Sequence, residues 1–319
     1  MKLRKLLSVI LLALIAVGCT KEDLSVCVTE NDVTLRFVLK EQGGLDRFNQ
    51  HINVVDLLIF DEDGLFVRRE TINERMLAEF QGKKTTLNPG TYYVVCWGNV
   101  RENSALSVLT PGVTSIKDCF IEIPATATKT GDPIYYAPYV RNTYSRNANM
   151  PQSRRLSSEF AIWELVVPPM ESVEKEVNFI RAHCTIHAYV EGLIDQKNGS
   201  LYAPIIELEE AWSRYNFLFE TLNYRTDLSQ QSVLANTLGG QMYFSQFHVG
   251  FGEVIPDINV IVRRGSDREV IAVVNLRQFL TDHPDENNND IHIQISFLDD
   301  HGVAISVPGW IEDIIKPGY

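Results

Sequence analysis

The amino-acid sequence predicts an all-β protein built from two tandem antiparallel β-sandwiches. Most of its segments either alternate apolar and polar residues or form short runs of β-branched and aromatic residues. Gly, Pro and Asp separate these segments at close intervals, as they do in sandwich folds. The adjacent prolines Pro168-Pro169 interrupt the pattern near the middle of the chain, and a central strand does not accept two prolines. We therefore place the boundary between the sandwiches there.

The first sandwich is predicted from segments on both sides of clear turn signals. Residues 33–39 alternate apolar and polar side chains, which is the pattern of a strand with one buried face. The apolar segment 54–60 runs into Asp61-Glu62-Asp63-Gly64, which has the composition of a hairpin turn. The turn 87–90 introduces the aromatic and β-branched segment 91–97. Further strands are expected at 65–67, 120–123 and 162–167, with a long, polar, tyrosine-rich surface loop at 126–155.

The second sandwich begins where strand-forming residues resume after the prolines. Strands are expected at 175–191, 215–219, 243–249, 258–262 and 270–275, followed by a short helix or turn at 276–280. The segment 291–297 alternates strictly, and the turn 299–302 leads into the apolar segment 303–307. Both segments are therefore predicted to be strands.

The N-terminus has the features of a bacterial lipoprotein signal peptide. A basic start precedes the apolar segment 6–17, which is too short to span a bilayer. This segment ends in Ala16-Val17-Gly18-Cys19, a run of small residues before a cysteine, which predicts cleavage after Gly18 and acylation of Cys19. Each buried CH₂ of an acyl chain contributes about 0.8 kcal/mol, so several chains would give firm attachment to a membrane.

Three charged residues follow almost directly after the predicted lipidation site. Lys21-Glu22-Asp23 is similar to the surface-export signal of lipoproteins in the Bacteroidota, although a solvated tether would have the same composition. We expect the protein to be lipid-anchored in the outer membrane and exposed on the cell surface. The chain then divides into a signal peptide (1–18), a lipidated tether (19–31), an N-terminal sandwich (32–168) and a C-terminal sandwich (169–319).

The composition is that of a folded acidic protein. Hydrophobic residues make up 45% of the chain and charged residues 22%, which are ordinary values for a globular protein. The formal net charge of −12 opposes binding to nucleic acid, and no nucleic-acid partner is expected. No apolar stretch after Val17 is long enough to cross a membrane, so the lipid is the only anchor that the sequence indicates.

The remaining cysteines do not suggest a metal or redox site. Cys27, Cys96, Cys119 and Cys184 contain no C-x-x-C pair. Cys96 and Cys184 lie in apolar strand segments and are expected to be buried like small hydrophobic residues. A disulfide between Cys27 and Cys119 remains an open alternative, because spacing alone does not determine connectivity.

The search for catalytic and metal-binding residues gives only weak candidates. His183 and His187 would share one face of a strand, but two ligands do not complete a metal site. Asp61-Glu62-Asp63-Gly64 departs from the spacing of a calcium loop, and 284–290 is better interpreted as an exposed polar loop than as a weak calcium site. His283 and its two neighbouring aspartates lack a nucleophile. We therefore expect no metal, no cofactor and no enzymatic activity.

Tyrosines in the predicted surface loop suggest an alternative function. Tyr135, Tyr136, Tyr139 and Tyr144 would offer flat apolar rings with polar rims if they were exposed. Such rings suit sugars or protein surfaces, although tyrosines of this kind can also pack in the core or against their own loop. A surface glycan-binding or adhesin lipoprotein, with a glycan or a host protein as its ligand, is therefore the alternative to the function derived next.

Several segments together resemble one known family. They are 23–27, 33–37, 55–66 and 87–99, in that order after the lipidated cysteine. This arrangement is similar to the FimB-type fimbrial anchor and minor-subunit lipoproteins of the Bacteroidota, the group that builds type V pili. The similarity is most specific from Cys19 to Asn99. The chain departs from the family pattern at Val28, where proline is frequent, and at Cys96, where a small residue is frequent.

The resemblance implies two transthyretin-like β-sandwich domains, no enzymatic activity, and fimbrial subunits as partners. Such subunits assemble by β-strand complementation, in which a partner strand fills a groove opened by loss of the N-terminal strand. An anchor keeps its lipidated N-terminus, so its own groove would stay closed. We expect a non-enzymatic surface lipoprotein that anchors a fimbria to the outer membrane or serves as a minor fimbrial subunit. The segment 303–319 is expected to be either donated to a partner or permanently docked.

Overall fold

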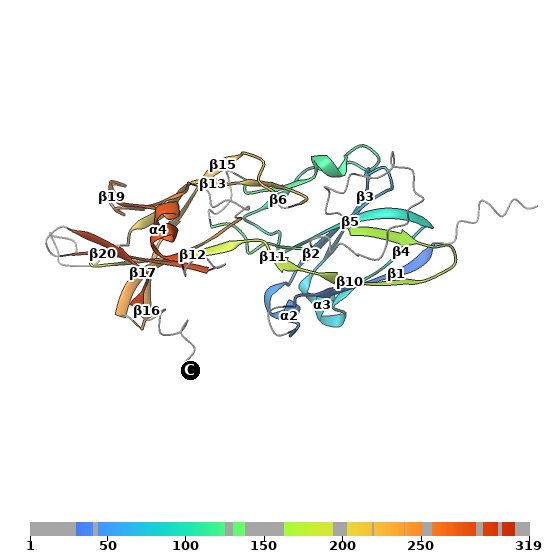
Figure 1. The fold of residues 1–319 in the computed structure, drawn as a ribbon, viewed down its shortest axis with the longest axis horizontal. Coiled ribbons are helices and arrows are strands. Elements are labelled where there is room, and N and C mark those ends of the chain that lie inside the picture. The colour runs from blue at the N-terminus through green and yellow to red at the C-terminus, as the bar shows by residue number, and fades with distance from the viewer. Residues whose placement is uncertain are drawn as a thin grey trace, which may run out of the picture.

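The computed structural model describes residues 30–40, 44–124, 130–137, 163–193, 203–218, 220–238, 240–250, 257–284, 290–298 and 302–309. Strands dominate these residues and helices are few and short, which confirms the all-β prediction. An N-terminal half and a C-terminal half lie end to end along the long axis of the molecule (Figure 1). None of the described helices is long and apolar enough to cross a membrane.

The N-terminal half contains two sheets that enclose one apolar core. The smaller sheet has the order β10-β1-β4, with β1 (Asn31–Val38), β4 (Gly82–Leu87) and β10 (Val173–Asn178). The larger sheet has the order β11-β8-β5-β2-β3, and β9 pairs with β5 beside this path. Its strands are β2 (Val55–Phe60), β3 (Phe66–Ile72), β5 (Gly90–Gly98), β8 (Tyr135–Tyr136), β9 (Trp163–Val167) and β11 (Ile180–Arg181). Two short helices, α2 (Phe48–His51) and α3 (Glu74–Glu79), accompany them.

The first strand, β1, is the middle strand of the smaller sheet. It pairs in parallel with β10 and antiparallel with β4. The alternating residues Val33, Leu35 and Phe37 are at most 1% exposed, as the period-two pattern predicts. The ring of Phe37 packs against Phe48 and Phe179, with ring centroids 5.8 and 5.6 Å away. The N-terminal strand is therefore an integral part of the core.

The C-terminal half is also made of two sheets around one core. A five-stranded sheet has the order β16-β17-β12-β20-β21, and a four-stranded sheet has the order β15-β13-β18-β19. The five strands are β12 (Cys184–Glu191), β16 (Val233–Thr237), β17 (Gly240–Val249), β20 (Asp290–Phe297) and β21 (Val303–Ser306). The four strands are β13 (Ile205–Trp212), β15 (Arg225–Gln231), β18 (Asn259–Arg263) and β19 (Val270–Asn275). Helix α4 (Leu276–Asp282) buries three residues in this core and confirms the short helix expected there.

A third small sheet connects the two halves. It has the order β14-β7-β6, with β6 (Ala105–Leu106) and β7 (Phe120–Glu122) from the N-terminal half and β14 (Arg214–Asn216) from the C-terminal half. A separate apolar cluster lies beneath it and includes Trp97, Cys119 and Tyr215. The halves are therefore joined by backbone hydrogen bonds and shared apolar packing as well as by the chain itself.

The strand pairing moves the predicted boundary between the halves. Pro168-Pro169 and Met170 form a turn from β9 into β10, and Met170 has a φ of +60°. Because β10 pairs with β1 and β11 with β8, residues 173–181 belong to the N-terminal sheets. The division expected at 168/169 is therefore wrong by about a dozen residues, and the chain enters the C-terminal half next to Ala182.

Other local predictions also need correction. The pairs β1–β10 and β12–β20 are parallel, so neither half is purely antiparallel. Part of the expected loop 126–155 forms strand β8 instead. The strand expected at 215–219 is confined to β14, because residues 217–218 turn back. The turn expected at Asp61 is confirmed, since its carboxylate accepts hydrogen bonds from the N–H groups of Asp63 and Leu65.

Replacing Phe37 with Ala should lower the free energy of unfolding by about 3–5 kcal/mol, because it removes a fully buried ring from the β1 core. Urea denaturation of the purified protein measures this change. The matched control is Arg36→Ala on the same strand, whose side chain forms an ion pair with Glu174 that is more than half exposed. A loss of less than about 1 kcal/mol is expected there. Equal losses in the two variants would contradict the position given to β1.

Candidate functional site

The residues predicted to carry the lipid and the export signal are Gly18, Cys19, Lys21, Glu22 and Asp23, and all five lie outside the described residues. They remain predictions. The described features that bear on function are the N-terminal strand, the junction between the halves, and the free edges of the sheets.

The tyrosines expected on a surface loop are largely packed inside. Tyr135 is 6% exposed and belongs to the N-terminal core, while Tyr136 is half-buried against the cluster that connects the halves. Tyr139 and Tyr144 lie outside the described residues. Of the two alternatives for these tyrosines, packing holds for the first two and an exposed ring platform does not, because β8 takes them into the larger sheet.

The candidate metal ligands His183 and His187 do not converge on one point. The side chain of His183 contacts Arg181 and the carbonyl of Ile134, whereas the ring of His187 stacks on His292 with centroids 4.6 Å apart. Within the ranges given above, no three His, Cys, Asp or Glu residues are grouped in a way that could hold a metal ion. His183 is therefore held by hydrogen bonds and His187 by ring stacking.

The cysteines in the described ranges are buried thiols that form no disulfide. Cys96 and Cys184 are 2% and 3% exposed, which confirms that they pack as small hydrophobic residues. Cys119 is fully buried and free, so it is not paired with Cys27, which lies outside the described residues. Burial raises the pKa of the Cys119 thiol to about 12, which makes it a poor nucleophile.

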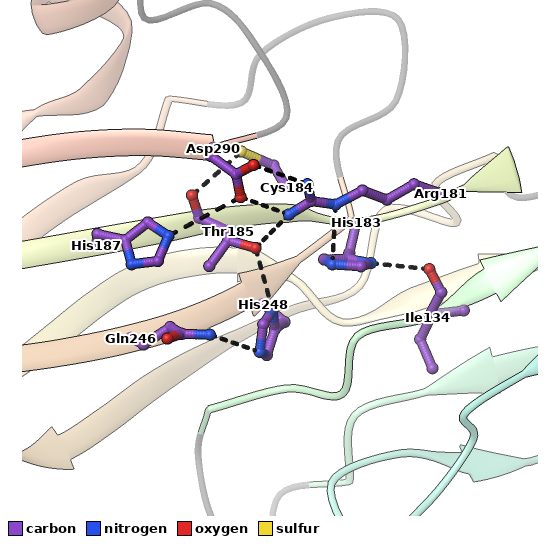
Figure 2. Close-up of polar contacts among 9 residues, drawn as sticks. All are labelled: Ile134, Arg181, His183, Cys184, Thr185, His187, Gln246, His248 and Asp290. Atoms are coloured by element: carbon purple, nitrogen blue, oxygen red, sulfur yellow. Dashed lines mark hydrogen bonds and ion pairs between the residues drawn. The ribbon is translucent and has the colours of Figure 1, made fainter. Parts of the chain in front are cut away.

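A polar cluster lies at the junction between the halves and centres on Arg181 (Figure 2). Arg181 ends β11 in the N-terminal half, and Asp290 begins β20 in the C-terminal half. Two guanidinium nitrogens of Arg181 donate to the two carboxylate oxygens of Asp290 at 2.6 and 2.9 Å. The same guanidinium donates to Nε2 of His183 at 3.0 Å and to the hydroxyl of Thr185. One side chain thus connects the end of one half to two strands of the other.

The hydrogen bonds of His183 fix its tautomer. Because Nε2 accepts from Arg181, the proton of the neutral ring is on Nδ1, which donates to the carbonyl of Ile134 at 2.9 Å. The ring also meets His248 edge-on, with centroids 5.1 Å apart. Since Ile134 belongs to the N-terminal half and His248 to β17, His183 contacts both halves as well.

Burial and positive charge keep these histidines neutral. Burial is the main cause that lowers the pKa of His183 to about 3 and that of His248 to about 4, and the Arg181 guanidinium lowers both further. Burial would raise the pKa of Asp290, but hydrogen bonding and the charges of His187 and Arg181 lower it well below its usual range. His187 Nε2 is 3.9 Å from this carboxylate, beyond hydrogen-bond distance, so we assign the lowering mainly to Arg181.

A small cavity of about 20 Å³ lies beside the cluster, between the halves. Its lining includes Ser104, Asp132, His183, Tyr215 and His248. This volume is sufficient for one water molecule and too small for an organic ligand. The junction is therefore a packed structural contact rather than a binding pocket.

Two further contacts close the junction. Arg214 of β14 forms an ion pair with Glu122 of β7 at 2.6 Å and lies over the ring of Phe120, 4.3 Å from its centroid. Gly131 has a φ of +71°, and a Cβ atom there would lie 1.9 Å from the carbonyl oxygen of His248. The N-terminal half can approach β17 this closely only because residue 131 is glycine.

The first and last described strands differ in how firmly they are held. β1 pairs on both edges and buries its alternate side chains, so the N-terminal half has no vacant position between β10 and β4. β21 pairs only with β20, through four residue positions from Gln294–Ser306 to Phe297–Val303. Its apolar residues Val303 and Ile305 are both 41% exposed. β21 is therefore a short edge strand with little packing.

Replacing Arg181 with Met should lower the free energy of unfolding by about 2–3 kcal/mol. The substitution leaves Asp290, His183 and Thr185 without their shared donor in a partly buried site. Chemical denaturation measures the change. Arg75→Met is the matched control, because Arg75 pairs with Glu79 in a contact that is 88% and 70% exposed, and it should change stability by less than about 0.5 kcal/mol. If Arg181→Met left the free energy of unfolding unchanged, the cluster would not hold the junction.

Stability should fall as the pH decreases from about 6.5 to about 4. In this window the unfolded chain protonates His183 and His248 near the ordinary pKa, whereas the folded protein does not. Each histidine should lower the free energy of unfolding by about 1–2 kcal/mol between pH 6.5 and pH 5. Denaturation at several pH values tests this, and His248→Gln should reduce the slope. An equal slope in both proteins would exclude His248 as a source of the pH dependence.

Comparisons with known proteins agree with this architecture. The family model described as fimbrillin-A associated anchor proteins Mfa1 and Mfa2 matches residues 24–316. No curated protein matches the chain by sequence.

Several solved structures are similar over most of their length. A candidate adhesin from Bacteroides ovatus has a TM-score of 0.63 at 14% identity, covering 88% of this chain and 95% of that chain. A structure of candidate polysaccharide-binding proteins from Bacteroides thetaiotaomicron has a TM-score of 0.64 at 13% identity, and the match covers 88% of this chain and 97% of that chain. The fimbrial anchor protein Mfa2 from Porphyromonas gingivalis has a TM-score of 0.57 at 14% identity, and the match covers 86% of this chain and 95% of that chain. At such identities these structures establish the shared fold, and the family model, which spans most of the chain, shows that this protein belongs to the family of fimbrillin-A associated anchor proteins.

Proposed function

We propose that this protein is a surface lipoprotein that ends a fimbria at the outer membrane, as its anchor or as a minor subunit. Membership of the anchor family supports a fimbria-associated, non-enzymatic role. The observation that carries the proposal is the position of β1 between β10 and β4. A subunit that accepts a partner strand at this position would have to lack its own first strand. With β1 in place, the N-terminal half accepts none, so the chain of subunits ends here.

The lipid would be attached close to this closed half. Eleven residues, 20–30, separate Cys19 from the start of β1. Fully extended, they span about 40 Å at most, so the N-terminal half would stay near the membrane. Lys21, Glu22 and Asp23 lie at the membrane end of this tether and would direct the lipoprotein to the outer face.

The C-terminal half is then the part that joins the fibre by strand exchange. β21 is held by one neighbour and buries little apolar surface, so a segment beginning at Val303 could leave without disturbing the core. Main-chain hydrogen bonds to a partner would supply affinity, and its alternating side chains would supply specificity.

The glycan-binding alternative has less support. One structural relative is described as a candidate polysaccharide-binding protein, but its likeness at 13% identity concerns the fold. The residues that suggested a sugar platform include Tyr135, which is buried in the N-terminal core. We therefore retain the fimbrial role as the conclusion.

The anchoring role is tested in a fimbriated strain with Cys19→Ala and the matched control Cys27→Ala. Cys19→Ala should abolish lipid labelling and release fibres into the medium, because the acyl chains are the proposed attachment. Cys27→Ala should retain both lipid and fibres. Replacing Lys21, Glu22 and Asp23 together with Ala should leave the protein lipidated but protected from protease added to intact cells. Unchanged membrane retention and attached fibres in Cys19→Ala would refute lipid anchoring.

The role of the C-terminal segment is tested by deleting Gly309 to Tyr319. If this segment is donated, the deletion should release fibres while the melting temperature of the purified protein stays within about 2 °C of wild type. Unfolding of the C-terminal half would instead identify a permanently docked strand. A folded variant that still carries attached fibres would exclude the segment from the mechanism.

A further inference from the structure

Strand β16 forms a free edge of the five-stranded sheet. Among the strands described above it pairs only with β17, from Val233–Phe244 to Thr237–Gly240. Its start is fixed, because the N–H and the hydroxyl of Ser232 both donate to the carbonyl of Pro204, at 3.0 and 2.7 Å. The strand is therefore well positioned on one side, while on its other side no described strand pairs with its main-chain donors and acceptors.

This edge is apolar on both faces. Val233 is 57% exposed and Leu234 is 50% exposed, and adjacent residues of a strand point to opposite faces of the sheet. Leu238, in the turn that follows, is 81% exposed. A chain lying along β16 could thus cover apolar side chains on either face while extending the main-chain ladder.

The edge also lacks the charges that protect other edges of the molecule. Residues 228–252 contain no Asp, Glu, Lys or Arg, although 22% of the chain is charged. Edge strands elsewhere carry charges, namely Arg68, Arg69 and Glu70 on β3, Lys83 and Lys84 on β4, and Glu174, Lys175 and Glu176 on β10. The edge strands β19 and β21 are also uncharged, but charged residues precede them in the chain, at Arg264, Asp267 and Glu269 before β19 and at Asp299 and Asp300 before β21. Charges on edges block strand addition, so β16 is the edge least protected against it.

Size and charge decide which occupant fits. A second copy would bring another body of net charge −12 against this one. A five-residue edge is about 17 Å long. The surface along such an edge is far smaller than the roughly 1,200 Å² that stable interfaces between rigid bodies bury. A single extended segment can form the same ladder of main-chain hydrogen bonds without bringing a second acidic protein against this one. Its side chains alternate between the two faces of the sheet, so they can cover both Val233 and Leu234.

We propose that the β16 edge adds an extended, uncharged segment of a neighbouring fimbrial subunit, with apolar side chains on both of its faces. This contact is separate from any exchange of β21, which lies at the opposite edge of the same sheet. The inference rests on the proposed fimbrial role and adds to it a second strand-addition site on the C-terminal half.

The test places a photo-reactive amino acid at Leu238 in fimbriated cells and maps the crosslinked peptides by mass spectrometry. The expected product joins residue 238 to an uncharged segment of a fimbrial subunit. Leu234→Lys and Val233→Lys should each lower its yield about tenfold, because a lysine must be desolvated at the new strand pair, at about 1.4 kcal/mol per tenfold. The matched control is Val273→Lys, an edge residue of β19 that is 52% exposed, and it should leave the yield unchanged. Melting temperatures of the purified variants establish that all three are folded.

The outcomes separate this inference from the anchoring proposal. If deleting the whole protein leaves fibres attached to cells, the fimbrial role itself fails. If the deletion releases fibres while Leu234→Lys and Val233→Lys keep the wild-type crosslink, the role stands and the β16 site is wrong. A crosslink to a second copy of this chain, or an equal loss in Val273→Lys, would also overturn the β16 site.

Discussion

The pairing of β1 with β10 and β4 is the constraint on which the rest of the molecule depends. It brings the first described strand next to a strand about 140 residues later, and the ring of Phe37 meets Phe179 from the end of that later segment. Without β1, β10 and β4 would not be joined in one sheet, and the core between the two sheets would lose Val33, Leu35 and Phe37. The same pairing closes the N-terminal half to a partner strand, so stability and proposed function rest on one interaction.

The junction connects the N-terminal half to the C-terminal half through two groups of polar contacts. Arg181 leaves β11 directly after the segment that pairs with β1, and its ion pair with Asp290 fixes the start of β20 beside β12. Arg214 and Glu122 make a second connection through the small sheet. A protein that holds a fibre on a membrane would have to carry load from one end to the other, and two such contacts oppose bending better than a single linker does. Among the described strands, β16 and β21 are the two edges of the five-stranded sheet in the C-terminal half, whereas the proposed lipid tether would precede the N-terminal half.

Local sequence patterns predicted much of the fold and little of the junction. The alternation at 33–39 and 291–297 identified strands correctly, because one buried face imposes a period of two. Pro168-Pro169 suggested a boundary but form a turn, since β10 returns to the first sheet through pairing that no local pattern encodes. Arg181 and Asp290 are 109 residues apart, so their contact follows from topology alone. The sequence singles out His183 and His187 only as an incomplete metal site, because it does not show that Arg181 and Ile134 occupy the nitrogens of His183.

On this proposal, the mature protein keeps its first strand while it is part of a fimbriated cell surface. The most direct measurement is mass spectrometry of the protein recovered from washed, fimbriated cells together with its attached fibres. We expect one chain that begins at an acylated Cys19 and still contains the peptide from Asn31 to Val38. A mature chain that begins after Val38, with β1 removed, would contradict it, because the N-terminal half would then be open to a partner strand.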